Sequence, residues 1–208
     1  MSLAEIERWR QQGPLGKLHN IVVYIQASIQ WEQKFWELSS GSRLTRDNDT
    51  RWNSWFSILT VAINLQEAID EYCQEFKAEL SVDHTDDILS NTDWETLTEI
   101  KGFLEKLLYS TKALESLESC IDLMLPNFEY ILKIFETAKE LNATNHIISP
   151  MVNSGWQKLQ KYYELSDESH VYVTALILNP RRKWQWLDKK WSDQPTWLRD
   201  AKRKVQRL

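Results

Sequence analysis

The segment DNDTRWNSWF, residues 47–56, has the composition of a helix start. Asp49 or Thr50 can act as the N-cap, because their side-chain oxygens accept hydrogen bonds from the first free amides of a helix. Apolar residues then recur every three or four positions from Trp52 to Phe76, which is the period of one helix face. This stripe predicts a single helix over residues 51–79, about 40 Å long at 1.5 Å per residue.

Two interpretations of the Arg51-Trp52 pair remain open. A cation beside a large aromatic ring in a first helical turn can hold a phosphate and stack on a base, which favours contact with DNA. Alternatively, Trp52 joins Trp55 and Phe56 in the core, and Arg51 faces solvent or a carboxylate. The spacing alone favours this second, structural interpretation.

The rest of the chain has helical periodicity as well. Five Gly and five Pro in 208 residues argue against the many tight turns of an all-β fold. Thr92 and Glu95 match a capping box, and Ser149-Pro150 matches an N-cap followed by a first-turn proline. Residues 170–178 are β-branched enough for a strand, but a short buried helix is favoured because no second strand is visible. We therefore predict an all-α bundle of about seven to nine helices.

We predict a single helical domain over residues 1–208. Within it we distinguish N-terminal helices (1–40), a helical body (47–180) and basic C-terminal helices (181–208). The polar, acidic segment 81–89 is the alternative place for a division into two lobes.

The charge is unevenly distributed along the chain. Residues 181–208 carry ten Lys and Arg against three Asp, a net charge of +7, whereas residues 1–180 carry −12. A basic segment of this kind can meet nucleic acid or can be an ordinary solvated helix face. The charge by itself favours the second of these, an ordinary solvated helix face.

Several classes of function lack support in the sequence. The histidines are scattered and no His–Cys set has metal-ligand spacing, so no metal site and no cofactor are predicted. No nucleophile elbow or glycine-rich phosphate loop occurs, so no catalytic residue and no small-molecule substrate are predicted. The longest apolar run, residues 171–178, is too short to cross a membrane. Cys73 and Cys120 are expected to be reduced thiols.

Four segments of the chain resemble hAT superfamily transposases, especially those of fungal genomes, and they follow one another in the order found in that family. The run at residues 47–55 resembles the TRWNS signature, and residues 13–22 resemble the segment ahead of it. Residues 93–95 with the Leu-rich stretch after them resemble the start of the family's helical insertion. Residues 175–184 resemble its A-x-x-LxPxxKW stretch, with Asn179 where many relatives carry Asp.

The resemblance implies a DNA transposase with an RNase H-like core, two Asp and one Glu that bind divalent metal, and a large helical insertion. In that family the Arg-Trp pair lies near the catalytic centre, and its Trp stacks on a flipped base; only Arg51 and Trp52 inherit this role here. The catalytic carboxylates, the RNase H-like core and the C-terminal dimerisation segment are expected outside residues 1–208. We therefore expect a chain that does not cut DNA.

The leading functional hypothesis is a non-catalytic fragment of a hAT-type transposase that keeps weak DNA contact, for instance with a transposon end or hairpin, through Arg51 and Trp52. Nuclear localisation and self-association through exposed apolar surface are expected with it. The alternative is a co-opted helical protein-interaction module with no role at DNA. The acidity of residues 1–180 favours this alternative, because it repels phosphate.

Overall fold

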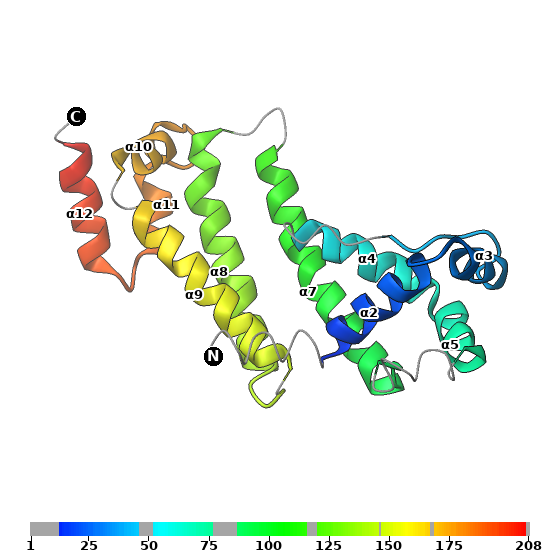
Figure 1. Ribbon diagram of the computed structural model, residues 1–208. Coiled ribbons are helices and arrows are strands. Elements are labelled where there is room, and N and C mark those ends of the chain that lie inside the picture. The colour runs from blue at the N-terminus through cyan, green and yellow to red at the C-terminus, as the bar shows by residue number, and fades with distance from the viewer. Residues whose placement is uncertain are drawn as a thin grey trace. The chain divides into compact units, whose positions relative to one another are not determined.

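The computed structural model describes residues 13–45, 52–76, 87–115, 120–145, 147–166 and 169–206. Within these ranges the chain forms ten α-helices and one short 3-10 turn, with no β-strand (Figure 1). The predicted all-α class is confirmed. The ten helices of the described residues exceed the predicted seven to nine. One difference is that the single helix expected over residues 51–79 is two.

The helix that follows the Arg-Trp pair bends at Leu65. Helix α4 covers Trp52–Asn64 and α5 covers Gln66–Glu75. The Leu65 amide hydrogen-bonds to the carbonyl oxygens of both Val61 and Ala62, at 3.1 Å each, which tightens the last turn of α4. Leu65 itself has φ −108° and ψ 19°, outside the helical values. The bend allows α5 to pack against α3 (Ile29–Leu38), so tertiary packing outweighs the continuous apolar stripe.

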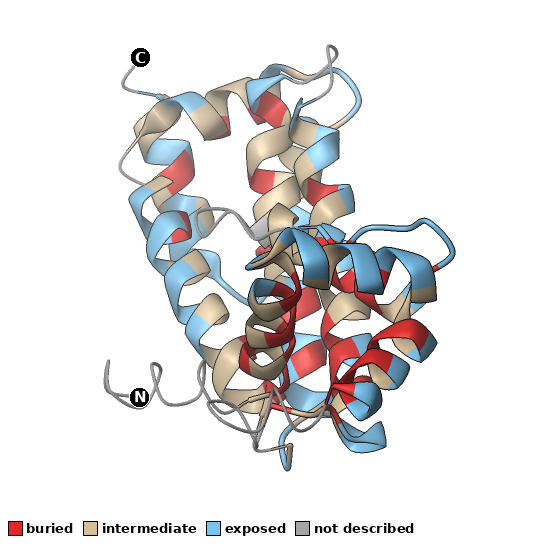
Figure 2. Cartoon of the chain, turned by 45° about the vertical axis from the view of Figure 1, so that its right-hand side comes forward, coloured by how far each residue is buried: buried red, intermediate tan, exposed pale blue. Residues whose placement is uncertain are grey.

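The backbone contacts divide the chain into two compact units, residues 1–105 and 106–208. The first unit contains α2 (Pro14–Gln26), α3, α4, α5 and most of α7 (Asn91–Glu115). Of the N-terminal helices predicted over residues 1–40, the part at residues 1–12 lies outside the described residues. One apolar side from each helix builds the core of this unit; Figure 2 marks the buried residues of both units in red. The fully buried members include Leu18, Ile21, Ile25, Phe35, Leu59, Ile69, Tyr72, Leu97 and Ile100.

Helix α7 has a capping box, two residues earlier than predicted. The Ser90 hydroxyl accepts a hydrogen bond from the Asp93 amide at 3.2 Å, and Asp93 Oδ2 accepts from the Ser90 amide at 2.9 Å. The predicted box at Thr92 and Glu95 is wrong, because both residues already lie inside the helix. Lys17 of α2 also donates to Asp93 Oδ2 at 2.9 Å, so the start of α7 is tied to α2.

The second unit is built around a helix pair, α8 and α9, with shorter helices packed at one end of it (Figure 1). A 3-10 turn leads into α8. The elements of this unit are η1 (Ile121–Leu123), α8 (Met124–Leu141), α9 (Ile148–Ser166), α10 (His170–Leu178), α11 (Lys183–Lys190) and α12 (Pro195–Val205). Their shared core consists of Leu125, Tyr163, Val173, Leu176, Leu187, Trp191 and Ala201.

Two predicted details of this unit have different outcomes. Residues 170–178 form helix α10, as favoured, and the Ser169 hydroxyl accepts a hydrogen bond from the Val171 amide at its start. The predicted start of α9 at Ser149-Pro150 is wrong. The helix begins at Ile148, and Asn145 caps it instead, because its Oδ1 accepts from the amides of Ile147 and Ile148 at 2.9 and 3.0 Å.

The boundary between the two units falls inside α7 and not in segment 81–89, of which residues 81–86 lie outside the described part. That residues 1–208 form one domain stays a prediction.

Candidate functional site

Trp52, the second residue of the predicted DNA-contacting pair, begins α4. The helix begins at Trp52, whose side chain is not among those the structure describes, and Arg51 lies outside the described residues together with the predicted N-caps at 49 and 50. The first turn of α4 contains no acidic residue. A helix N-terminus carries a partial positive charge from its free amides, which favours an anion beside this turn. Asp47 and Asp49, which precede the pair in the sequence, lie outside the described residues.

The residues that follow the pair are packed against the protein. The ring of Trp55 lies 6.3 Å from that of His19 on α2, and both Trp55 and Phe56 are half-buried. The Asn53 Oδ1 atom is buried and has no hydrogen-bond partner among the described residues. For Trp55 and Phe56 the structural interpretation of the motif is therefore the one that the geometry supports. The roles of Arg51 and Trp52 themselves stay a prediction.

The basic C-terminal helices have both an inward and an outward set of cations. Arg182 faces inward: its Nη1 donates to Asp122 Oδ2, and Asp122 is only 9% exposed. On the outer side Lys202 pairs with Asp188 at 3.5 Å, and Arg203 pairs with Asp200 at 2.6 Å. Five further cations are exposed with no ion pair to a described residue: Arg181, Lys183, Lys189, Lys190 and Arg199. These outward residues form a solvated basic surface that could meet phosphate.

Asn179 belongs to the same inward cluster. Its Nδ2 donates to Asp122 Oδ2 at 2.6 Å, and its Oδ1 accepts from the Arg181 amide at 2.8 Å. An Asp at position 179 would place a second carboxylate against that of Asp122. Arg182 alone would then have to neutralise both negative charges. The neutral amide of Asn179 therefore avoids this repulsion and donates a hydrogen bond to Asp122 instead.

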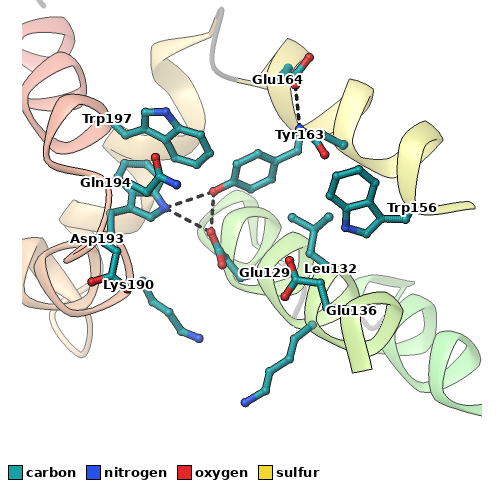
Figure 3. Close-up of a pocket in the computed structure, with 13 residues that line it drawn as sticks. Glu129, Leu132, Glu136, Trp156, Tyr163, Glu164, Lys190, Asp193, Gln194 and Trp197 are labelled. Carbon is teal, nitrogen blue, oxygen red and sulfur yellow. Dashed lines mark hydrogen bonds between the residues drawn. The ribbon is translucent and has the colours of Figure 1, made fainter. Parts of the chain in front are cut away.

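A hollow of about 500 Å³ opens in the second unit between α8, α9 and the α11–α12 turn (Figure 3). At one side of it three groups form a triangle: Tyr163 Oη donates to Glu129 Oε1 at 2.6 Å, and Trp191 Nε1 lies 3.2 Å from both Glu129 Oε1 and Tyr163 Oη. The Trp197 ring packs edge-on against Trp191 and tilted against Tyr163, with 5.9 Å between ring centroids in each pair.

The sequence did not reveal this hollow. Tyr163 and Trp191 are both buried, at 7% and 4% exposed. Glu129 is 34 residues from Tyr163 and 62 from Trp191, so no local spacing indicates that they meet. The one available signal was the large number of Trp residues, 11 in the chain.

No metal-binding cluster of three or more His, Cys, Asp or Glu side chains occurs among the described residues. Cys73 and Cys120 are both free thiols; Cys73 is buried and Cys120 is exposed. Burial, and to a smaller extent the negative charge of Asp70, raises the pKa of the Cys73 thiol to about 12. This thiol is therefore protonated and unreactive at neutral pH. None of the described helices has the length and apolarity that a membrane crossing requires.

Residues 5–103 match the family model described as the ZBED1 RNase-like helical domain, a hAT-related domain. The matched range contains the segment at 13–22, the Arg-Trp run and residues 93–95, whereas residues 175–184 lie beyond it. The match supports the resemblance to hAT-related proteins over the first half of the chain.

A candidate transcriptional regulator, tpeD, of Talaromyces stipitatus is 26% identical over 190 residues. The alignment covers 88% of this chain and 20% of that protein, so the chain spans about a fifth of the relative's length. No solved structure matches. The chain is thus similar to a hAT-related helical domain in its first half, and to one segment of a much longer fungal protein over most of its length.

Proposed function

We propose that this chain is a non-catalytic segment of a hAT-type transposase, or of a protein derived from one, and that it contacts DNA through Arg51 and Trp52. The observation that carries the proposal is the position of the pair. In the sequence the pair stands where α4 begins, since that helix starts at Trp52, and both residues fall within the range that matches the hAT-related domain. An arginine there can hold a phosphate, and the indole can stack on an unpaired base.

Catalysis is not part of the proposed function. The carboxylates that bind divalent metal in this family are expected elsewhere in the full-length protein, so residues 1–208 are proposed to need no cofactor. A nuclear location follows from the proposed role at DNA, and is also compatible with the name of the fungal relative.

The DNA proposal predicts a specific pattern in an electrophoretic shift assay. The probe is a DNA hairpin with unpaired bases at its tip, and the protein is the whole chain at low salt. Combined substitution Arg51→Ala and Trp52→Ala should weaken binding by about tenfold to a hundredfold, because one base stack alone is worth about 1–3 kcal/mol. The dependence of log K on log salt should also become shallower, since one phosphate contact is lost.

A matched control is available in the same unit. Arg43→Ala combined with Trp36→Ala removes the same charge and the same ring from exposed positions, because Trp36 is 41% exposed and the Arg43 side chain 71%. This control should bind like the unmodified protein. Equal binding by the Arg51/Trp52 variant would contradict the site assignment. Metal-dependent cleavage of the hairpin by the pure chain would contradict the non-catalytic assignment.

One observation favours a second function, a helical protein-interaction module without a role at DNA. Residues 1–180 carry a net charge of −12, which repels a polyanion. Under this alternative no shift of the hairpin occurs even at low salt. Self-association would then be examined as one form of protein contact, by sedimentation of the pure chain.

A further inference from the structure

The hollow beside Glu129 has the features of a binding site that the DNA proposal does not use. All of its lining belongs to the second unit, and it reaches from α8 and α9 to the α11–α12 turn. Its size lies within the range of about 300–1,000 Å³ that is usual for ligand pockets. Figure 3 shows Trp197 on one side, Trp156 and Leu132 on the other, and Glu129 between them.

The carboxylate of Glu129 is held in place but its charge is not neutralised. Both donors to its Oε1, the Tyr163 hydroxyl and the Trp191 indole, are neutral groups. No Lys or Arg of the described residues forms an ion pair with this half-buried side chain. A partly desolvated charge without a counter-ion is costly, so a cation that enters the hollow would be favoured.

The walls beside this carboxylate are aromatic. Trp197 is 40% exposed and stands edge-on to Trp191, so part of its surface is open to a ligand. An indole is the best aromatic partner for a cation. At the mouth three exposed carboxylates, on Glu136, Glu164 and Asp193, outnumber the ammonium groups of Lys133 and Lys190. The electrostatic balance of the site therefore favours a positively charged occupant.

We propose that this hollow binds an arginine side chain presented by a basic peptide segment of a partner protein. A guanidinium is planar, stacks on aromatic faces and donates two parallel hydrogen bonds to a carboxylate, and it is less strongly hydrated than the ammonium of lysine. The volume exceeds what one side chain requires and leaves room for neighbouring residues of the peptide. The carboxylates at the mouth favour further basic residues beside the arginine.

This inference goes beyond the proposed contact with DNA and does not depend on it. The two sites lie in different units, and they select ligands of opposite charge. Substitution of Glu129 should leave the hairpin shift unchanged, and substitution of Arg51 and Trp52 should leave peptide binding unchanged. Failure of one proposal is therefore distinguishable from failure of the other.

The decisive experiment is calorimetric titration of the whole chain with three blocked peptides, each Ser-Lys-X-Lys-Ser. X is arginine, lysine or citrulline, which has the shape of arginine but no charge. The arginine peptide should bind at least tenfold more tightly than the citrulline peptide, with the lysine peptide between them. Equal affinities for arginine and citrulline, or no measurable heat at millimolar peptide, would overturn the proposal.

Two variants locate the binding to the hollow. Glu129→Gln keeps an acceptor for Tyr163 but removes the charge, and should weaken arginine-peptide binding at least tenfold. Glu140→Gln removes one charge from an exposed position of the same helix outside the hollow, and should change the affinity less than twofold. Equal losses in both variants would mean a non-specific charge effect and overturn the assignment.

The arginine-site proposal stays testable even if the Glu129→Gln variant folds poorly. Circular dichroism of Glu129→Gln reports its folding, and the comparison of arginine with citrulline needs only the unmodified protein. Unchanged affinity of a folded Glu129→Gln variant for the arginine peptide would also overturn the proposal.

Discussion

Asp93 lies in the first turn of α7 and forms hydrogen bonds with two partners. One is Ser90, the residue that caps this helix, and the other is Lys17 of the neighbouring helix α2. Partial burial by itself would raise the pKa of this carboxyl. The hydrogen bonds from the Ser90 amide, the Lys17 ammonium and the Ser90 hydroxyl, together with the charge of Lys17, outweigh burial and lower the pKa below its ordinary value of 3.8. The ionised form is therefore the one that the folded state stabilises.

A pH-dependent stability difference follows for Asp93→Asn. A carboxyl whose pKa is lowered by folding contributes stability above its unfolded pKa, and this contribution is lost as the pH falls through the folded pKa. The variant should be less stable by about 1 kcal/mol at pH 7, a typical value for a capping group. Denaturant melts at pH 7 and near pH 2.5 check this. A difference of the same size at both pH values would contradict the role of the ionised carboxylate.

The sequence predicted a capping box at the start of α7, but it did not predict which residues form the box. A Ser or Thr followed three residues later by an acid occurs at 90 and at 92, so two capping boxes compete in the sequence. The sequence-based choice of Thr92 with Glu95 was wrong. The contact with Lys17, 76 residues away, favours Ser90 with Asp93, and no local rule includes such a contact.

At the scale of helices, close approach of α9 to α8 depends on Gly155. A Cβ atom at this position would lie 2.5 Å from Cε1 and 2.8 Å from Cζ of Phe135, shorter than real Cβ contacts. Phe135 is only 7% exposed, so its ring has little room to move away. Gly102 in α7 has no such neighbour, since nothing lies within 4 Å of the same hypothetical atom.

The two glycines therefore predict opposite effects of one substitution. Gly155→Ala should lower the free energy of unfolding, because overpacking costs about 1–3 kcal/mol and exceeds the helix-propensity gain. Gly102→Ala should raise it by up to about 1 kcal/mol, because the propensity gain is not opposed. Urea denaturation of both variants measures the difference. Stabilisation by Gly155→Ala would show that α8 and α9 are not as close as described.

Helix boundaries show the same dependence on distant contacts. The stripe from Trp52 to Phe76 correctly predicted helix on both sides of Leu65 and missed the bend there. Periodicity records which residues are buried, and it is nearly the same for a straight helix and for two helices in succession. The packing of α5 on α3 is a tertiary contact, so the bend could not be predicted from the period.

At the scale of the whole molecule, the predicted single domain can be tested by unfolding. Asp93 lies in the first compact unit and Gly155 in the second. One domain over residues 1–208 predicts one cooperative transition that both Asp93→Asn and Gly155→Ala shift. Calorimetric and circular dichroism melts should then coincide. Two transitions, each shifted by only one variant, would mean two independently folding domains.

Composition and local pattern were sufficient to predict the all-α class, the short helix α10, the positive charge of residues 181–208 and the resemblance of the N-terminal half to a hAT-related domain. These depend on composition, on short-range periodicity and on motifs, which are properties of neighbouring residues. Tertiary packing was needed to establish the bend at Leu65, the caps at Ser90 and Asn145 and the inward position of Arg182. It was also needed to bring Glu129 together with Tyr163 and Trp191. Each of those depends on groups far apart in the chain, whose burial and charge take effect only when the helices pack.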